Sequence, residues 1–471
     1  MLTRCGYYSH MSTGEAGHAG ARSPDQPLDR RVITAWSLWS WGNSTVSAVM
    51  VTFVFGTYIA SEHFGPDDRG TQWLTTANAI AGAVIALTAP VIGQRADRAG
   101  RRRLWLGINT FIVVGLVAAC FFVRPEPGFL LLGVTLMASM TLFDEFANLN
   151  YNAMITDIAD HSRMGRVSGI GWGAGYMGGI VILALVYFGL VAGDPPHWFG
   201  LGEEEAINIR MVAVVAAAWF LIWALPLLLM RPATADAVRA EQEAPERLSI
   251  WASYRRLLRI VVGLWKEDRN TFWFLISSAV YRDGLSAVFT YGAILGVGVY
   301  GIAAGDILLF GIAGNVVAAL GAFAGGWFDD RTGPRQVIMF CVGSLVAVGT
   351  VLYFLDVERE VLGMTLTPET SFWIFGLALC LFVGPAQASS RAFLGRLAPP
   401  DRAGELFGLY ATAGRSVSFL TPALISLTLW AVGGQKAIII GVVTILAAGM
   451  LMLLLVRNPE GPAKMREKSL R

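Results

Sequence analysis

The chain has 471 residues, of which 55% are hydrophobic and only 15% are charged. A soluble protein of this length carries more charge, so the composition indicates a protein embedded in a lipid bilayer. The net charge of +2 comes from basic residues dispersed among apolar runs, which gives no indication of a nucleic-acid partner.

The first 33 residues are rich in Gly, Ser, His and Arg and lack the apolar run of a cleaved signal peptide. We expect residues 1–33 to form a disordered cytoplasmic tail. Cys5 lies in this tail, whereas Cys120, Cys341 and Cys380 lie in apolar segments. Their spacing predicts neither a disulfide nor a metal site.

Apolar runs of about 20 residues, the length that crosses the hydrocarbon core of a bilayer, occur in two groups. The first group, in an N-terminal half over 34–230, comprises 34–60, 73–95, 104–123, 129–154, 167–192 and 209–230. The second group, in a C-terminal half over 271–456, comprises 271–299, 305–328, 335–355, 370–397, 403–430 and 435–456. The pattern predicts an all-α membrane protein with twelve transmembrane helices in two six-helix halves.

The polar stretch 231–270 separates the two halves. Near its end, aromatic and aliphatic residues from Trp251 to Trp265 recur at helical spacing beside three arginines. This pattern predicts a helix at the membrane surface, and the alternative is a solvated linker helix.

Basic residues are concentrated in the loops on one side of the predicted bundle, and cytoplasmic loops carry an excess of Lys and Arg. We therefore expect both termini, including a short tail at 457–471, in the cytoplasm of a bacterial cell with the spans in the inner membrane. The basic residues of these loops include Arg95, Arg98, Arg101, Arg102, Arg103, Arg163, Arg166, Arg331, Arg335, Arg396 and Arg402.

Several landmarks of the first half recur in the second at a nearly constant offset. The loop GQRADRAGRR, which begins at Gly93, recurs 233 residues later as GWFDDRTGPR, which begins at Gly326. Repeats in spans of matching rank indicate two halves with parallel topology. At an offset of 239, Arg163, Gly165 and Gly169 recur as Arg402, Gly404 and Gly408.

The two halves and the G-x-x-x-D-R-x-G-R-R loop resemble the major facilitator superfamily over the whole chain. A narrower resemblance, to the vacuole-effluxer-like permeases related to the fungal autophagy-related amino-acid effluxer, is carried by WSLWSWGNS, NAMITDIADHSRMGRVSGIGWGAGYMGG, YRDGLSAVFTYG and GPAQASSRAFLGRLAPPDRAGELFGLYATAGR. Ser40 stands where these relatives usually have Asp. The resemblance implies a secondary transporter working by alternating access, with amino acids as the suggested solutes.

Asp97 stands beside several arginines where the second span leaves the membrane. An ion pair or a contact with the N-terminus of a neighbouring helix is available to it. The resemblance implies that this loop braces a cytoplasmic gate, whereas the alternative is that its arginines only set the topology. The implied gate residues are Gly93, Asp97, Arg98, Gly100, Arg101 and Arg102, with Asp330 and Arg331 in the second copy.

Charged side chains inside the spans are few, and each is costly unless it meets a partner or water. The resemblance implies that the first, fourth, seventh and tenth spans line a central cavity. Their polar residues are therefore candidates for solute binding or coupling, and the alternative is that they tie helices together. The candidates are Asn43, Asp144, Glu145, Asn148, Tyr281, Arg282, Asp283, Gln387 and Arg391, with Arg415 added from the eleventh span.

Arg282 and Asp144 lie at similar depth, about ten residues from the inner ends of their helices. We expect Asp144 or Glu145 to pair with Arg282, and protonation or solute binding to break this pair. The five histidines lie outside the spans, so carboxylates would carry any proton. Glycines four residues apart in the fifth span predict close helix packing.

No G-x-x-x-x-G-K-[ST] stretch or catalytic constellation occurs, so we expect neither an enzyme nor a cofactor. The expected partners are a small-molecule solute, the lipid bilayer and, for coupling, protons, without an obligate protein partner. A sugar, peptide or drug transporter on the same fold is an alternative, as is a membrane sensor or scaffold that has lost transport.

Overall fold

The computed structural model describes residues 29–65, 69–98, 102–230, 250–361, 364–399 and 402–459. These stretches are mainly helical and include one antiparallel hairpin, β1 (Arg359–Val361) with β2 (Met364–Leu366). Each expected span coincides with a helical segment. Nine helices of the described chain are long and apolar enough to cross a membrane, judged by length and composition.

The first helix of the N-terminal half begins earlier than expected. The Asp29 side chain accepts a hydrogen bond from the Arg31 N–H, and this cap starts the helix at Arg30 instead of residue 34. The rest of the expected tail, 1–28, lies outside the described residues. The half comprises α1 (Arg30–Thr45), a π-helical segment (Val46–Phe53), α2 (Phe55–Ile59), α3 (Arg69–Arg98), α4 (Arg102–Ala119), α5 (Leu130–Ala153), α6 (Ile155–Ile158), α7 (Met164–Val186) and α8 (Ile207–Leu229).

A helix at the expected place, α10 (Ile250–Glu267), leads into the C-terminal half. Residues 231–249 of the expected linker lie outside the described residues. Leu258 and Trp265 are exposed on α10, and the Tyr254 hydroxyl donates to the carbonyl of Leu87 on α3. The C-terminal half comprises α11 (Arg269–Gly298), α12 (Ala304–Thr332), α13 (Pro334–Tyr353), α14 (Pro368–Leu397), α15 (Ala403–Val417), α16 (Leu420–Val432) and α17 (Ala437–Leu453).

The eleventh expected span, 403–430, is not one continuous helix, because it breaks between α15 and α16. Pro422 has no N–H to bond to the carbonyl of Ser418, so the backbone ladder is interrupted there. The Asp283 carboxylate on α11 accepts hydrogen bonds from the N–H of Thr421 at 2.9 Å and from its hydroxyl at 2.7 Å. A side chain of another helix thus caps the first turn of α16.

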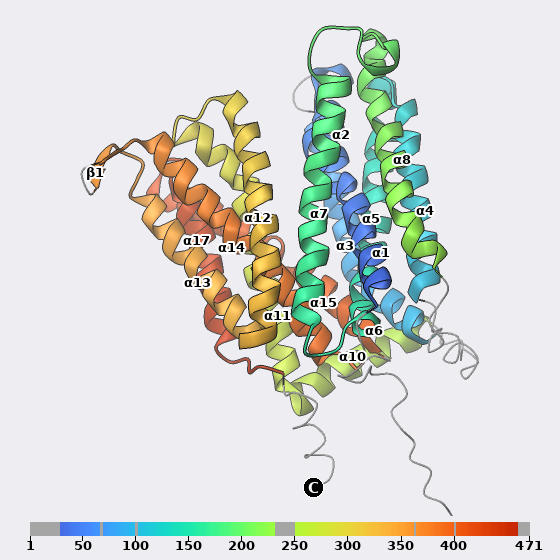
Figure 1. Ribbon diagram of the computed structural model, residues 1–471, viewed down its shortest axis with the longest axis vertical. Coiled ribbons are helices and arrows are strands. Elements are labelled where there is room, and N and C mark those ends of the chain that lie inside the picture. The colour runs from blue at the N-terminus through green and yellow to red at the C-terminus, as the bar shows by residue number, and fades with distance from the viewer. Residues whose placement is uncertain are drawn as a thin grey trace, which may run out of the picture.

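The two halves meet at one end of the molecule. In Figure 1 their helices converge near α6, α10 and the start of α15 and diverge toward the other end. We call the convergent end, where α3 and α12 finish and α7 and α15 begin, the contact end. Gly169 on α7 lies so close to α12 that a Cβ atom there would be 2.5 Å from the carbonyl oxygen of Ala322. The predicted close packing of the glycine-rich span is therefore confirmed.

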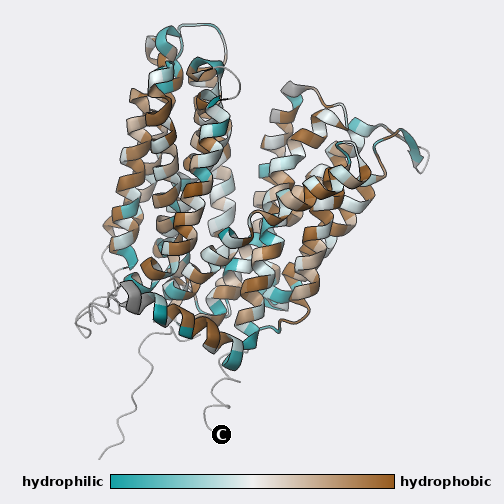
Figure 2. Cartoon of the chain, turned by 180° about the vertical axis from the view of Figure 1, so that it is seen from behind, coloured by the Kyte–Doolittle hydropathy of each residue, from teal (hydrophilic) through white to brown (hydrophobic). Residues whose placement is uncertain are grey.

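Hydrophobic residues run along the helices of both halves, and hydrophilic residues gather at helix ends and in the hairpin (Figure 2). Several large apolar side chains are exposed, including Trp430 at 84% and Leu229 at 75%. Water solvates such a surface poorly, whereas lipid tails solvate it well and helices satisfy their own backbone groups. The chain is an integral membrane protein.

Candidate functional site

Three of the predicted polar residues form a cluster within the N-terminal half. Asn43 on α1 donates a hydrogen bond to one carboxylate oxygen of Asp144 on α5. Asn148, one turn further along α5, donates to the other oxygen at 3.1 Å and approaches the Asn43 side-chain oxygen at 3.4 Å. The Asp144 carboxylate is therefore held by two amides.

Glu145 joins the two halves. Its side chain points about 100° away from that of Asp144 around α5. One of its carboxylate oxygens lies 2.8 Å from the guanidinium of Arg415 on α15, and both side chains are partly exposed. The predicted charged pair between the halves exists, but its basic member is Arg415.

Arg282 does not pair with Asp144 or Glu145, which corrects the expected pairing. Its guanidinium carbon lies 3.9 Å from the centre of the Tyr410 ring, a neighbour in its own half. Its Nε and Nη1 atoms are buried and have no hydrogen-bond partner among the described residues. The similar depth of Arg282 and Asp144 in the membrane predicted the wrong pair. Helix α15 instead places Arg415 beside Glu145, and its Tyr410 ring holds Arg282 within the C-terminal half.

Arg391 on α14 is buried at the interface between the halves, with 5% of its surface exposed. It donates to the Ser168 hydroxyl at 2.9 Å and to the Ser168 carbonyl at 2.6 Å on α7. It also donates to the Asn152 side chain on α5 at 3.1 Å and lies 4.7 Å from the Trp36 ring. Arg391 thus ties α14 to three helices of the other half.

The remaining solute candidates lie within the C-terminal half. The Tyr281 hydroxyl lies 2.6 Å from the Ser390 hydroxyl on α14. Asp283 caps α16 as described above, and Gln387 is partly buried on α14 without a hydrogen bond from its side chain to any described residue. The structure therefore divides the predicted residues among several local contacts.

At the contact end, Asp97 reaches from the end of α3 to the start of α15. Its carboxylate accepts hydrogen bonds from the N–H groups of Gly404 at 3.0 Å and Glu405 at 2.7 Å. The first N–H groups of a helix lack partners within the helix and carry a partial positive charge, so a carboxylate stabilises them. Asp97 also forms a 2.6 Å ion pair with Arg102, which in turn pairs with Asp157 at 3.0 Å.

The second copy of the loop repeats this contact with the halves exchanged. Asp330, at the end of α12, accepts hydrogen bonds from the N–H groups of Gly165 at 2.8 Å and Arg166 at 3.2 Å at the start of α7. Its positively charged neighbours include Arg396 of α14, at 3.1 Å, and the side chain of Arg166 itself, at 3.2 Å. The predicted repeat therefore produces two equivalent carboxylate caps across the interface.

The other predicted gate residues differ in their contacts. Gly93 is required by close approach, since a Cβ there would lie 2.1 Å from the Gly404 carbonyl oxygen. Arg331 lies over the ring of Trp327 in its own helix, 3.3 Å from the ring centre. Gly100, Arg101 and the side chain of Arg98 lie outside the described part of the chain.

Sequence reasoning missed several buried charges at the contact end. Glu405 accepts a hydrogen bond from Gln94 at 2.8 Å, and Arg396 forms an ion pair with Asp329. One signal was present, because Arg396 stands 239 residues after Asp157, the offset already found for the fifth and eleventh spans.

His161 lies in the loop between α6 and α7 at the contact end. Its carbonyl accepts a hydrogen bond from Arg396 at 2.9 Å. Partial burial, followed by the nearby Arg396 charge, lowers the pKa of the His161 imidazole, and Asp160 opposes this effect. The neutral form of the ring is therefore more strongly favoured than in a solvent-exposed histidine.

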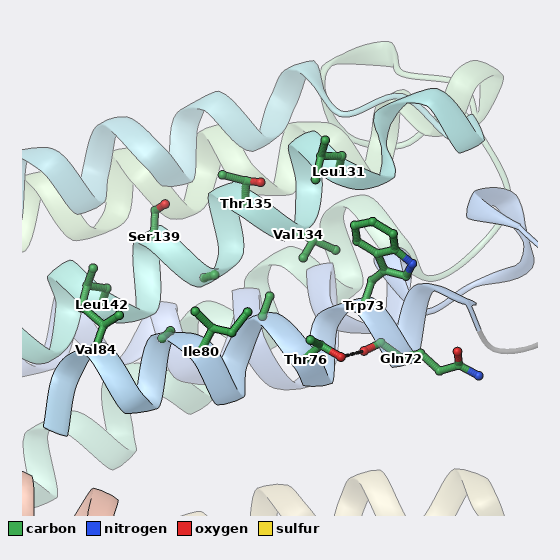
Figure 3. A pocket seen from close by; sticks show the side chains of 13 residues that line it. Gln72, Trp73, Thr76, Ile80, Val84, Leu131, Val134, Thr135, Ser139 and Leu142 are labelled. Atoms are coloured by element: carbon green, nitrogen blue, oxygen red, sulfur yellow. Dashed lines mark hydrogen bonds between the residues drawn. The ribbon is translucent and has the colours of Figure 1, made fainter. Parts of the chain in front are cut away.

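An apolar pocket of about 530 Å³ lies apart from these groups, between α3 and α5 (Figure 3). Trp73, Ile80 and Val84 of α3 face Leu131 and Leu142 of α5 across it. Its lining contains no charged residue and none of the predicted solute candidates. It belongs to the part of α3 remote from the contact end, and its polar lining groups are the neutral side chains of Gln72, Thr76, Thr135 and Ser139.

Comparisons with known proteins agree on family and fold. The family described as "Vacuole effluxer Atg22 like" matches residues 71–465. The uncharacterized MFS-type transporter YxiO of Bacillus subtilis is 25% identical over 89% of this chain and 93% of its own length. Autophagy-related protein 22-2 of Aspergillus clavatus is 21% identical over 56% of this chain, a match that spans only 43% of the fungal protein.

Solved structures show the same architecture. The proton:xylose symporter XylE, of the major facilitator superfamily, superposes with a TM-score of 0.67 at 12% identity, over 92% of this chain and 96% of that one. FucP in its outward conformation superposes with a TM-score of 0.63 at 15% identity, over 90% of this chain and 97% of that one. YxiO is an MFS-type transporter by its name, and XylE and FucP are transporters of the major facilitator superfamily. The chain belongs to the vacuole effluxer Atg22-like family and has the fold of the major facilitator superfamily.

Proposed function

We propose that this protein is a secondary transporter that moves a small solute by alternating access. The observation that carries the proposal is the pair of carboxylate caps at the contact end. Each cap joins the end of a helix in one half to the first turn of a helix in the other half. Such contacts can be made and broken without unfolding a helix, which suits a gate between two rigid halves.

The contact end is the cytoplasmic gate in this proposal. Arg102, Arg163, Arg166, Arg396 and Arg402 lie at or near this end, and the positive-inside rule then places both termini in the cytoplasm. The membrane would be the inner membrane of a bacterial cell. The conformation, with the halves joined at the contact end and diverging beyond it, is then the one that faces outward (Figure 1).

Amino acids are the solutes that we propose, with protons as the coupling ion. The region between the halves presents separate acidic and basic groups. The acidic group is Asp144, which is hydrogen-bonded by the amides of Asn43 and Asn148, and the basic group is Arg282, which stacks on the ring of Tyr410. A zwitterionic solute can use both kinds of group. Glu145 is the proposed coupling carboxylate, because its protonation would remove the ion pair with Arg415 that joins the halves.

Uptake and counterflow of labelled solutes into proteoliposomes, with and without an imposed pH gradient, test this proposal. The panel contains neutral, acidic and basic amino acids, together with xylose and a dipeptide. Saturable amino-acid flux that responds to the pH gradient is the expected result. Flux of the sugar or the dipeptide alone would assign another solute class, and absence of any flux would contradict transport and favour a sensor or scaffold.

A further inference from the structure

Arg282 is held in place by an aromatic ring and not by an acid. Its guanidinium lies over the Tyr410 ring at 3.9 Å, and its Nη1 atom lies 3.7 Å from the position that a Cβ would take at Gly414, one turn along α15. A cation over an aromatic face is attracted by the ring, which leaves the N–H edge of the guanidinium available. The stack therefore orients the donors of Arg282 without using them.

No described carboxylate neutralises Arg282. The three acidic side chains among the solute candidates are engaged elsewhere, Asp144 by Asn43 and Asn148, Glu145 by Arg415, and Asp283, on the same helix as Arg282, by Thr421. The Arg282 side chain makes no hydrogen bond to a described residue, and two of its nitrogens are buried. Arg282 is partly buried, and a cation with two buried nitrogens that lack acceptors is unfavourable in a membrane protein, so an anionic group from outside the chain would stabilise it.

The position of Arg282 faces the other half of the molecule. Phe289 follows it by seven residues, which is close to two full helical turns and places both on one face of α11. The Phe289 ring lies 6.5 Å from the ring of Tyr176 on α7, in the N-terminal half. The face of α11 that carries Arg282 is therefore the face that meets the opposite half, where a transported solute would pass.

We propose that Arg282 binds the carboxylate of the transported solute. The inference rests on the proposed function and assigns one residue to the carboxylate that the proposed solutes share. A planar guanidinium with free N–H donors matches a carboxylate with two parallel hydrogen bonds. One cation without an acidic partner also matches the single charge of a carboxylate better than the double charge of a phosphate.

The test compares matched ligands on the full chain in lipid nanodiscs. Thermal stabilisation is titrated with L-alanine and L-alaninamide, with L-leucine and L-leucinamide, with propionate and propionamide, and with inorganic phosphate. Arg282→Gln removes the cation, and Arg282→Lys keeps the charge without the planar donor pattern. Arg124→Gln is the matched control, because Arg124 is an exposed arginine whose Glu205 partner lies 3.7 Å away.

We expect at least one carboxylate to bind the wild type and the control about tenfold more tightly than its amide partner, a difference of about 1.4 kcal/mol. Arg282→Gln should reduce this ratio to about twofold or less, and Arg282→Lys should fall between. If Arg282→Gln fails to fold, the loss of preference in Arg282→Lys decides the question.

Three results would overturn the assignment: no carboxylate binds, phosphate binds in preference, or the variants keep the full wild-type preference. Counterflow of the same solutes separates this failure from failure of the proposed function. A carboxylate that binds through Arg282 but never crosses the bilayer contradicts transport. A neutral or cationic solute that crosses the bilayer equally fast through the wild type and through Arg282→Gln supports transport and contradicts only the assignment of Arg282 to a solute carboxylate.

Discussion

Glu145 and Arg415 form an ion pair between the halves, at a level nearer the middle of the bundle than the two carboxylate caps. Their side chains are 29% and 36% exposed, so solvent and ions weaken their attraction. Neighbouring Asp144 instead depends on neutral amides. Two adjacent acids therefore differ in what they stabilise, since only Glu145 links the halves.

A double-mutant cycle with Glu145→Gln, Arg415→Gln and the combined variant should reveal this link. We expect a coupling free energy of about 0.2–1 kcal/mol, because the pair is partly exposed. Thermal unfolding of the purified protein at low and high salt measures it, and the coupling should shrink at high salt. Strict additivity of the two single variants at low salt would show that the pair contributes nothing to this conformation.

The lowered pKa of His161 leads us to expect that the free energy of unfolding depends on pH. Its pKa is lowered in the folded protein, so between this pKa and the unfolded value of 6.5 the unfolded chain binds a proton that the folded protein does not. The contribution of His161 to the free energy of unfolding should therefore be fully present above about pH 6.5 and should decrease as the pH falls below that value. The midpoint of thermal unfolding between pH 7.5 and 5.5 measures this, and His161→Gln should flatten the slope. An unchanged slope in the variant would assign the dependence to other groups.

At the scale of elements, glycines allow the helices of the two halves to touch. Gly93 on α3 lies against the backbone of α15, whereas Gly82, three turns earlier on the same helix, has open space around its Cβ position. The two glycines cost the helix a similar amount in propensity, so replacing either with Ala changes local helix stability alike. They differ only in what an added methyl group would meet.

Gly93→Ala should therefore disfavour the closed contact end, and Gly82→Ala should not. Inserting an extra methyl group into a tight contact costs about 1–3 kcal/mol, which corresponds to roughly a 5-fold to 150-fold change in population. Alkylation of a cysteine at Thr412, in a Cys5→Ser background, reports opening, since the Thr412 hydroxyl now donates to the carbonyl of Ala86 across the interface. Equal alkylation rates in the two alanine variants would contradict the proposed role of Gly93.

Much of the element level was predictable from the sequence. Apolar runs predicted the helical spans, and the repeated loop predicted the Asp97 contact and its second copy at Asp330. The pairing of Arg282 was predicted wrongly, because hydropathy gives the depth of a residue but not the rotation of its helix. The break before α16 was also missed, because its cause combines Pro422 with a cap from Asp283 on a distant helix.

At the scale of the whole molecule, the contacts between the halves gather at one end. The two carboxylate caps, the Arg391 contacts and the close approach of Gly169 to α12 all lie toward the contact end. Because the halves repeat one topology, the Asp97 cap has its counterpart at Asp330, and the approach of Gly169 to Ala322 has its counterpart where Gly408 meets Ala89. Such an interface can open as a unit while each half keeps its own core, as rigid-body alternation requires.

The most direct measurement of this account is solute flux through a protein whose contact end is locked. Ala86→Cys with Thr412→Cys, in a Cys5→Ser background, places thiols on α3 and α15 where the two helices touch. Linking them with a short, reducible bifunctional reagent should lower counterflow by about tenfold or more, and reduction should restore it, while single-cysteine proteins stay active. Undiminished flux through the fully linked protein would contradict alternating access through this gate.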